Sequence, residues 1–191
     1  RTLISGGLDG AIVFWDVSTG ESIAKCREHS SVEGLALLSK QSNISVSAGS
    51  PPVYSTNEIP APPIILWDVA KREKVATLGD VVHGLVMSMA VSPNGTCIAL
   101  GVLSTDFVGD PFRVDLWDTK SHKKTITLPS EDSPSSLAFS PDGTVLAIPG
   151  CDLGGWANVK LSNVADGKQI AILKGHTDSV NKVLFSPDGK L

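Results

Sequence analysis

Short runs of apolar residues, many of them alternating with polar residues, follow one another along the whole chain. Between Arg113 and Trp117 the alternation places Arg113 and Asp115 on one face and Val114 and Leu116 on the other, which is the period of two of a half-buried β-strand. Gly, Pro, Asn, Asp and Ser separate the runs, as expected for strands joined by turns. The pattern predicts an all-β protein with strands at 2–5, 11–15, 22–26, 32–37, 44–48, 64–67, 74–78, 86–91, 97–101, 113–117, 124–128, 135–139, 145–148, 158–161, 169–173 and 180–185.

Two independent markers show that the strands belong to a repeated unit. Ser-Pro-Asx-Gly occurs at 92–95, 140–143 and 186–189, in steps of 48 and 46 residues. Trp-Asp ends an apolar run at 15–16, 67–68 and 117–118, and Leu161-Ser162 stands where a fourth pair is expected, giving steps of 52, 50 and 44. A shared period of this length is typical of stacked or radially repeated units.

The best-preserved unit begins at Gly175-His176, continues through an alternating segment and reaches the Ser186-Pro187-Asp188-Gly189 turn. With the Trp-Asp endings, this order of motifs resembles the WD-repeat β-propeller family over essentially the whole chain. The resemblance implies blades of four antiparallel strands, here called a to d, arranged around an axis.

The repeats divide residues 1–191 into a partial blade with strands b to d (1–27), three blades (28–79, 80–129 and 130–174) and the start of another (175–191). At about 45 residues a repeat, the chain supplies about four blades. Four closed blades are one arrangement. We expect instead a piece of a larger, seven-bladed ring, because the motif spacing resembles that of the seven-bladed members of the family and a cut at both ends explains why the chain starts at Arg1 rather than Met. Further domains of the same polypeptide are then expected.

Composition narrows the classes of function. The chain has 41% hydrophobic and 19% charged residues, 16 Lys and Arg against 20 Asp and Glu, and no block of like charge, so no nucleic-acid surface is expected. No apolar run is long enough to insert into a membrane, and no signal peptide is present at this N-terminus. These absences do not decide the compartment, which stays open, with a cytoplasmic protein favoured over a secreted one. Cys26, Cys97 and Cys151 read as small apolar side chains on or beside strands.

In the resembled family, a Gly-His histidine, a strand-b Ser or Thr, an Asp in the b–c turn and the strand-c Trp form a buried hydrogen-bonded set. Carried over by position, the resemblance implies structural roles for Ser5, Asp9 and Trp15 in the first unit, His29, Ser47 and Trp67 in the second, His83 and Trp117, with Asp110 as a doubtful aspartate, in the third, Asp152 in the fourth and His176 in the last. These residues are expected to brace the blades rather than to act as ligands or bases.

Candidate chemistry is sparse. The glycine clusters at 6–10 and 154–155 lead into strands, whereas a phosphate loop leads into a helix. No catalytic residue, metal site or cofactor is predicted, since no EF-hand or metal-site spacing and no nucleophile–histidine arrangement is found. The basic c–d turns at 71–74 and around His122 are expected on one face; solvated turns are favoured there over a contact with an acidic partner.

The b–c connections depart most from the simple repeat. Those at 50–63, 102–112 and 149–157 are long and are expected to lie together on one rim of the propeller. Exposed aromatic residues on a rigid scaffold anchor interfaces, although tolerated drift of loop sequence is an alternative. The candidate partner-binding residues are Tyr54, Asp106, Phe107, Asp110, Phe112, Asp152 and Trp156.

The resemblance implies a non-catalytic scaffold or regulatory platform that binds other proteins or peptides. The alternative is an enzyme or small-ligand-binding propeller with its site in the central channel. That alternative needs polar or metal-binding residues on the innermost strands, and Val86, Met89, Leu137 and Val183 are apolar.

Overall fold

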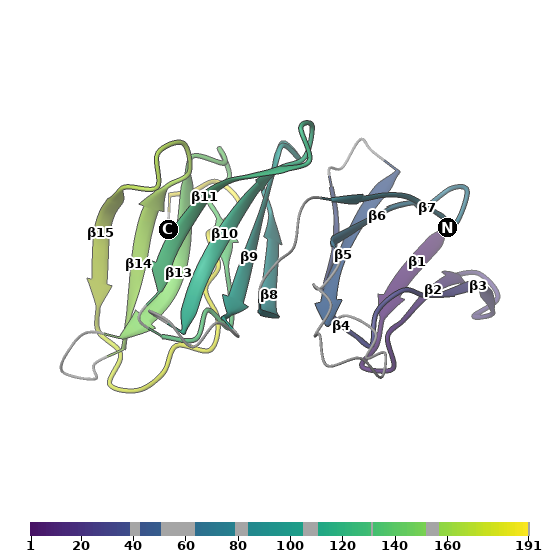
Figure 1. Cartoon of the computed structure of the whole chain (residues 1–191), viewed down its shortest axis with the longest axis horizontal. Coiled ribbons are helices and arrows are strands. Elements are labelled where there is room, and N and C mark those ends of the chain that lie inside the picture. Colours follow the sequence, from purple (N-terminus) through teal and green to yellow (C-terminus); the bar gives the residue numbers. More distant parts are fainter. Residues whose placement is uncertain are drawn as a thin grey trace.

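The chain forms β-strands that assemble into four antiparallel sheets (Figure 1). The computed structural model describes residues 1–38, 43–50, 64–78, 84–104, 111–130, 132–151 and 157–190. Within these ranges the regular structure consists of strands joined by turns, and no helix occurs. The all-β class predicted from the sequence is confirmed.

Each sheet is a meander in which every strand pairs with the one before it in the chain. The first sheet contains β1 (Thr2–Gly6), β2 (Ala11–Asp16) and β3 (Ser22–Arg27), and the second contains β4 (Ser31–Leu37), β5 (Ile44–Ser50), β6 (Ile64–Asp68) and β7 (Glu73–Leu78). The third contains β8 (Leu85–Val91), β9 (Cys97–Leu103), β10 (Phe112–Asp118) and β11 (Lys123–Ser130), and the fourth contains β12 (Ala138–Phe139), β13 (Val145–Cys151), β14 (Ala157–Asn163) and β15 (Gln169–Lys174). The last three sheets are the four-stranded units expected from the repeat.

Two expected strands differ from the structure. Residues 175–190, including the predicted strand at 180–185, form no strand, and the predicted strand at 135–139 is reduced to β12. A strand needs a hydrogen-bonded neighbour, and no described strand lies beside 180–185. Val180 and Val183 still pack against the fourth sheet, and the backbone N–H of Val183 donates to Ser136 Oγ over 3.2 Å.

The b–c connections of the third and fourth sheets are shorter than predicted. Strand β9 runs to Leu103 and β13 to Cys151, while Phe112 and Ala157 already begin β10 and β14. Pro149 is tolerated inside β13 because β12 pairs with β13 only at Leu146 and Ala147, so that β13 is an edge strand beyond this point.

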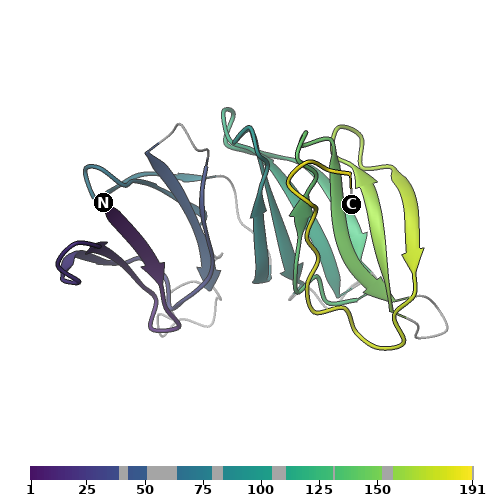
Figure 2. The same ribbon diagram turned by 180° about the vertical axis from the view of Figure 1, so that it is seen from behind.

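The sheets pack face to face in an open arc, with one hydrophobic core between each neighbouring pair (Figures 1 and 2). Between the first two sheets, Phe14 meets Trp67 edge to face, with ring centroids 6.5 Å apart. Ile64 and Leu66 face the third sheet, and Val114 and Leu116 face the fourth. The arc is the arrangement of propeller blades, and the seven-bladed ring stays a prediction.

The three Ser-Pro-Asx-Gly motifs form one recurrent turn. In each, the glycine N–H donates to the serine carbonyl, over 2.8 Å at Gly95 and Gly143 and 3.0 Å at Gly189. The serine hydroxyl donates to the Asx side chain, over 2.8 Å to Asn94, 2.5 Å to Asp142 and 3.0 Å to Asp188. Glycine is required here because its φ lies between 66° and 75°.

The structure moves the fourth equivalent of the Trp-Asp pair one residue further along the chain than the sequence predicted. The strand c to d pairing shifts register between Leu66 and Trp67, and likewise between Leu161 and Ser162. Asn163 Oδ1 accepts the N–H of Ala165 over 2.8 Å, as Asp68 Oδ1 accepts that of Ala70 over 2.9 Å. Ser162-Asn163, rather than Leu161-Ser162, therefore corresponds to Trp-Asp.

Candidate functional site

The second sheet contains a buried chain of three polar side chains. The indole N–H of Trp67 donates to Ser47 Oγ over 2.7 Å, and the Ser47 hydroxyl lies 2.8 Å from His29 Nε2. Strands β6 and β5 supply Trp67 and Ser47, and His29 precedes β4. All three are at most 2% exposed, so this set ties both strands to the start of β4.

Burial controls the protonation of His29. Loss of hydration lowers the pKa of His29 from 6.5 to about 4, with Glu28 opposing the shift and Lys74 adding to it. Among the described residues, His29 Nδ1 has no hydrogen-bond partner. The imidazole is therefore neutral at pH 7 and serves as part of the framework.

The first sheet contains a shorter version of the set. Trp15 Nε1 donates to Ser5 Oγ over 2.8 Å. Asp9 is not joined to them: its carboxylate accepts the N–H of Ala11 over 3.2 Å and lies 3.5 Å from Lys25 Nζ. Asp9 therefore closes the β1–β2 turn and pairs with β3.

In the third sheet the tryptophan is left without its hydroxyl. Trp117 is 2% exposed, and its Nε1 has no partner among the described residues. The residue in register with Ser47 is Leu100, because Leu100 lies opposite Asp115 as Ser47 lies opposite Ile65. His83 and Asp110 lie outside the described residues.

The fourth sheet lacks the set. Ser162 stands at the tryptophan position with a buried, unpartnered hydroxyl among the described residues, and Ile148 stands at the serine position. Asp152 lies outside the described residues. His176 is exposed beyond β15, beside the segment that contains Val180 and Val183.

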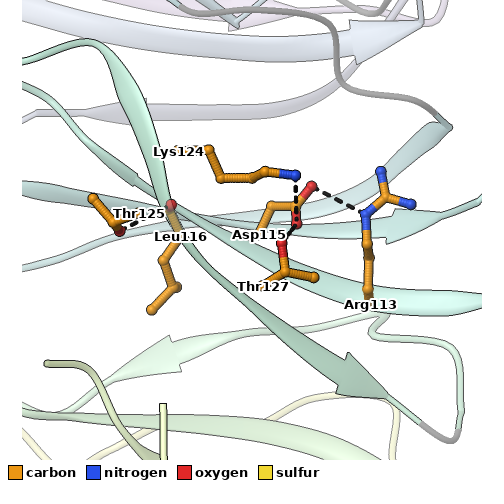
Figure 3. Close-up of polar contacts among 6 residues, drawn as sticks. All are labelled: Arg113, Asp115, Leu116, Lys124, Thr125 and Thr127. Carbon is orange, nitrogen blue, oxygen red and sulfur yellow. Dashed lines mark hydrogen bonds and ion pairs between the residues drawn. The ribbon is translucent and has the colours of Figure 1, made fainter. Parts of the chain in front are cut away.

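A buried ionic cluster in the third sheet was missed by sequence reasoning (Figure 3). Asp115 is fully buried, and its carboxylate lies 3.1 Å from Arg113 Nε and 3.6 Å from Lys124 Nζ, and accepts the Thr127 hydroxyl over 2.7 Å. Arg113 and Asp115 share one face as the alternation predicted, but that face is covered. The signal was a carboxylate at the position where β6 has Ile65.

The proposed rim lies where strand b passes to strand c, an edge at which β5, β9 and β13 all end (lower edge in Figure 1). Phe112 lies there as the first residue of β10, half-buried and paired with Leu103 and Ser130. Six of the candidate rim residues lie outside the described residues: Tyr54, Asp106, Phe107, Asp110, Asp152 and Trp156.

The apolar residues that the sequence predicts on strand a are packed in the hydrophobic cores. Val86, Leu137 and Val183 are at most 9% exposed, and Met89 packs against the core between the second and third sheets. Their neighbours Leu85 and Met87 are the exposed residues of β8, at 38% and 37%. The exposed face of this inner strand is therefore apolar.

Two apolar cavities lie in the arc. One, of about 430 Å³, lies between β1 and β4 and is lined by Leu3, Ile4, Leu35 and the buried hydroxyl of Ser45, among others. The other, of about 310 Å³, lies between the fourth sheet and the segment at 180–185. The first cavity borders the three-stranded first sheet, and the second borders a segment that forms no strand.

In the described part of the chain, the cysteine thiols are unreactive and the side chains that could bind a metal ion lie apart. Burial raises the pKa of the Cys97 thiol to about 11 and raises that of Cys26 as well. Within the described ranges, no three His, Cys, Asp or Glu side chains are grouped as metal ligands. No helix of the described residues is long and apolar enough to cross a bilayer.

Comparison with known proteins agrees with this architecture. Residues 167–191 match the family described as WD domain, G-beta repeat. The whole chain aligns with the periodic tryptophan protein 2 homolog of Dictyostelium discoideum at 28% identity over 196 residues, and spans 19% of that protein. An uncharacterised WD repeat-containing protein of Synechocystis is 30% identical over 112 residues, which cover 56% of this chain and 28% of that protein.

Proposed function

We propose that this chain, which is similar to WD-repeat proteins, is a non-catalytic platform on which other proteins or peptides assemble. WD-repeat proteins generally act as scaffolds for protein interactions. The surface that we propose for the contact is the edge where strand b passes to strand c. Further domains of the same polypeptide are among the proposed partners.

The observation that carries this proposal is a braced array of sheets in which β5, β9 and β13 all end at one edge. The His29, Ser47 and Trp67 set fixes one sheet internally, and the Asp115 cluster fixes another. Binding residues on loops gain precision when the scaffold beneath them is rigid. The array supports the loops at 51–63, 104–111 and 152–156 in this way.

The proposed anchors are the aromatic residues of these connections. Aromatic side chains give much contact area for little conformational entropy, and they dominate interface energies. Phe112 begins β10 at the edge where β5 and β13 end. The acidic residues Asp106, Asp110 and Asp152 would select partners with basic side chains there.

The test exchanges one connection in the full-length protein. Residues 51–63 are replaced by Asp-Gly, and in a matched control residues 39–42, at the opposite end of the same sheet, are replaced by Asn-Gly. Affinity capture with quantitative mass spectrometry should lose specific partners from the first variant only, with thermal unfolding unchanged in both. Identical partner sets from both variants would contradict the proposed edge.

A further inference from the structure

The four turns that join strand c to strand d share one geometry. In each, a backbone N–H returns to the carbonyl of the residue at the Asp position: Gly20 to Asp16 over 2.8 Å, Arg72 to Asp68 over 2.7 Å, His122 to Asp118 over 3.0 Å and Gly167 to Asn163 over 2.9 Å. The donating residue has φ of 75°, 63°, 60° and 72° respectively. All four turns therefore place this residue in the left-handed region.

Two of the four turns fill this position with a basic residue rather than glycine. Left-handed backbone crowds the Cβ of any residue with a side chain, and glycine avoids this cost. Among the described residues, Arg72 and His122 are the non-glycine residues with positive φ. Retained strain of this kind points to a function for the side chain rather than for the turn.

The same two turns concentrate positive charge. Residues 68–74 and 118–124 contain six Lys or Arg and three Asp or Glu, a formal charge of +3 in a chain of −4, which leaves −7 on the remaining residues. Lys71, Lys74 and Lys124 lie within ion-pair distance of Asp68, Glu28 and Asp115. For Arg72, Lys120 and Lys123, the described part of the structure contains no ion pair.

Both turns lie on the face opposite the strand b to strand c edge. Val69 N–H donates to the Asn43 carbonyl over 2.7 Å, and Thr119 N–H donates to the Thr96 carbonyl over 3.0 Å, so each turn is fixed to the end of its sheet where strand b begins. The turn between β10 and β11 projects from the upper edge in Figure 1. This surface is therefore separate from the one assigned to the proposed function.

We propose that the basic side chains of these two turns, Lys71 and Arg72 in one and Lys120, His122 and Lys123 in the other, bind an acidic segment of a partner protein. Complementary charge steers such segments and selects against basic ones. A protein segment fits better than a nucleic acid, because these turns contain no Phe, Tyr or Trp on which bases stack and the surrounding chain is acidic. The inference does not depend on the strand b to strand c edge.

The test uses the full-length protein and a fluorescent oligoglutamate peptide. Wild-type protein should bind the peptide at low salt and release it near 1 M salt, where the Debye length is about 3 Å. Replacing Arg72 and His122 with Gly should weaken binding about fivefold or more. The same replacement should raise Tm by about 2–4 °C for each position, since strain is relieved.

Two further variants test whether the charges of these two turns, rather than backbone strain or any exposed lysine, account for the binding. Lys120→Gln with Lys123→Gln should weaken binding by a similar factor without the rise in Tm. Lys168→Gln, which removes an exposed charge from the equivalent turn of the fourth sheet, should leave binding unchanged. Salt-insensitive binding, equal affinity of wild-type and glycine variants, or tighter binding of a single-stranded RNA oligonucleotide than of oligoglutamate would overturn the proposal.

Discussion

At the scale of single residues, one hydroxyl group holds two strands and a turn together. Ser47 Oγ meets both Trp67 Nε1 and His29 Nε2 in a fully buried environment. Removing a shared partner leaves buried polar groups without hydrogen bonds, which costs more than the loss of one bond. The position is therefore expected to be more sensitive than its small size suggests.

Ser47→Ala should lower the free energy of unfolding by about 2–4 kcal/mol, because it leaves two buried groups unpaired. Urea unfolding followed by tryptophan fluorescence measures this change. Ser22→Ala, at an exposed position of β3, is the control and should change stability by less than about 0.5 kcal/mol. Equal values for the two variants would show that the buried set contributes nothing.

The two buried tryptophans offer a matched comparison. Phe in place of Trp117 removes an indole N–H that has no described partner, whereas Phe in place of Trp67 breaks a bond to Ser47. Trp67→Phe should therefore be more destabilising than Trp117→Phe by about 1–2 kcal/mol, measured by urea unfolding. The reverse order would mean that Trp117 has a partner of its own.

Protonation of His29 should destabilise the fold in mildly acidic solution. Its folded-state pKa of about 4 lies below the unfolded value of 6.5, so folding disfavours the bound proton. This contribution is fully present above about pH 6.5 and is lost as pH falls towards 4, up to about 3 kcal/mol at 1.36 kcal/mol per pKa unit.

The free energy of unfolding, measured between pH 7 and pH 4, should fall as the pH is lowered. His29→Gln should make this dependence on pH weaker. Hydrogen bonds also lower the pKa values of Asp16, Asp142 and Asp188, and their contribution to stability is lost on further acidification, so the comparison with His29→Gln separates the histidine from these carboxyl groups. An unchanged slope in His29→Gln would assign the acid sensitivity to another group.

At the scale of elements, the third sheet differs from the second by one buried charge. Asp115 replaces Ile65 in register, and Arg113, Lys124 and Thr127 satisfy it. Removing one partner of a buried ion pair leaves the other charge buried and uncompensated, which is strongly destabilising. The intact pair itself adds little to the free energy of unfolding. The cluster is therefore expected to fix geometry more than to add stability.

Asp115→Asn should destabilise the protein by about 2–4 kcal/mol, because the amide cannot balance two cations. Thermal or urea unfolding measures the effect, with Glu33→Gln on an exposed strand position as the control. A loss no larger than that of the control would mean that the cations relax into solvent.

Sequence periodicity located most strands to within a residue or two, because Trp-Asp and Ser-Pro-Asx-Gly mark fixed points of each unit. It failed where tertiary context decides. The segment at 180–185 has the alternation of a strand but no neighbour to pair with, and Leu103 and Phe112 pair across what appeared from composition to be a loop. The Leu161 assignment failed because the fourth unit has neither Trp nor Asp at these positions, so that only the register shift shared with the other units identifies Ser162 as the equivalent of Trp.

The hydrogen-bonded sets were predictable only where each residue type is present. Ser5 and Trp15 could be matched by position, but the separation of Asp9 from them follows from its bonds to Ala11 and Lys25. The burial of Asp115 was not predicted, because charged residues that alternate with apolar ones on a strand normally indicate an exposed face. Packing between sheets, rather than sequence pattern, decides that case.

At the scale of the whole molecule, the four sheets form an open arc with apolar surface at both ends. Leu3 at one end and Leu173 and Leu184 at the other are at least half exposed. Such surfaces favour further packing. We predict seven blades for the complete ring; class averages of the full-length protein by electron microscopy would contradict this if they showed another number.

Site-specific photo-crosslinking in the full-length protein tests the proposed contact edge most directly. A photoreactive phenylalanine analogue replaces Phe112 at the edge or, as a control, Val75, which is 54% exposed on the outer strand β7. The account predicts that partners lost on exchange of residues 51–63 crosslink from position 112 and not from position 75. Crosslinks from position 75 alone would contradict it.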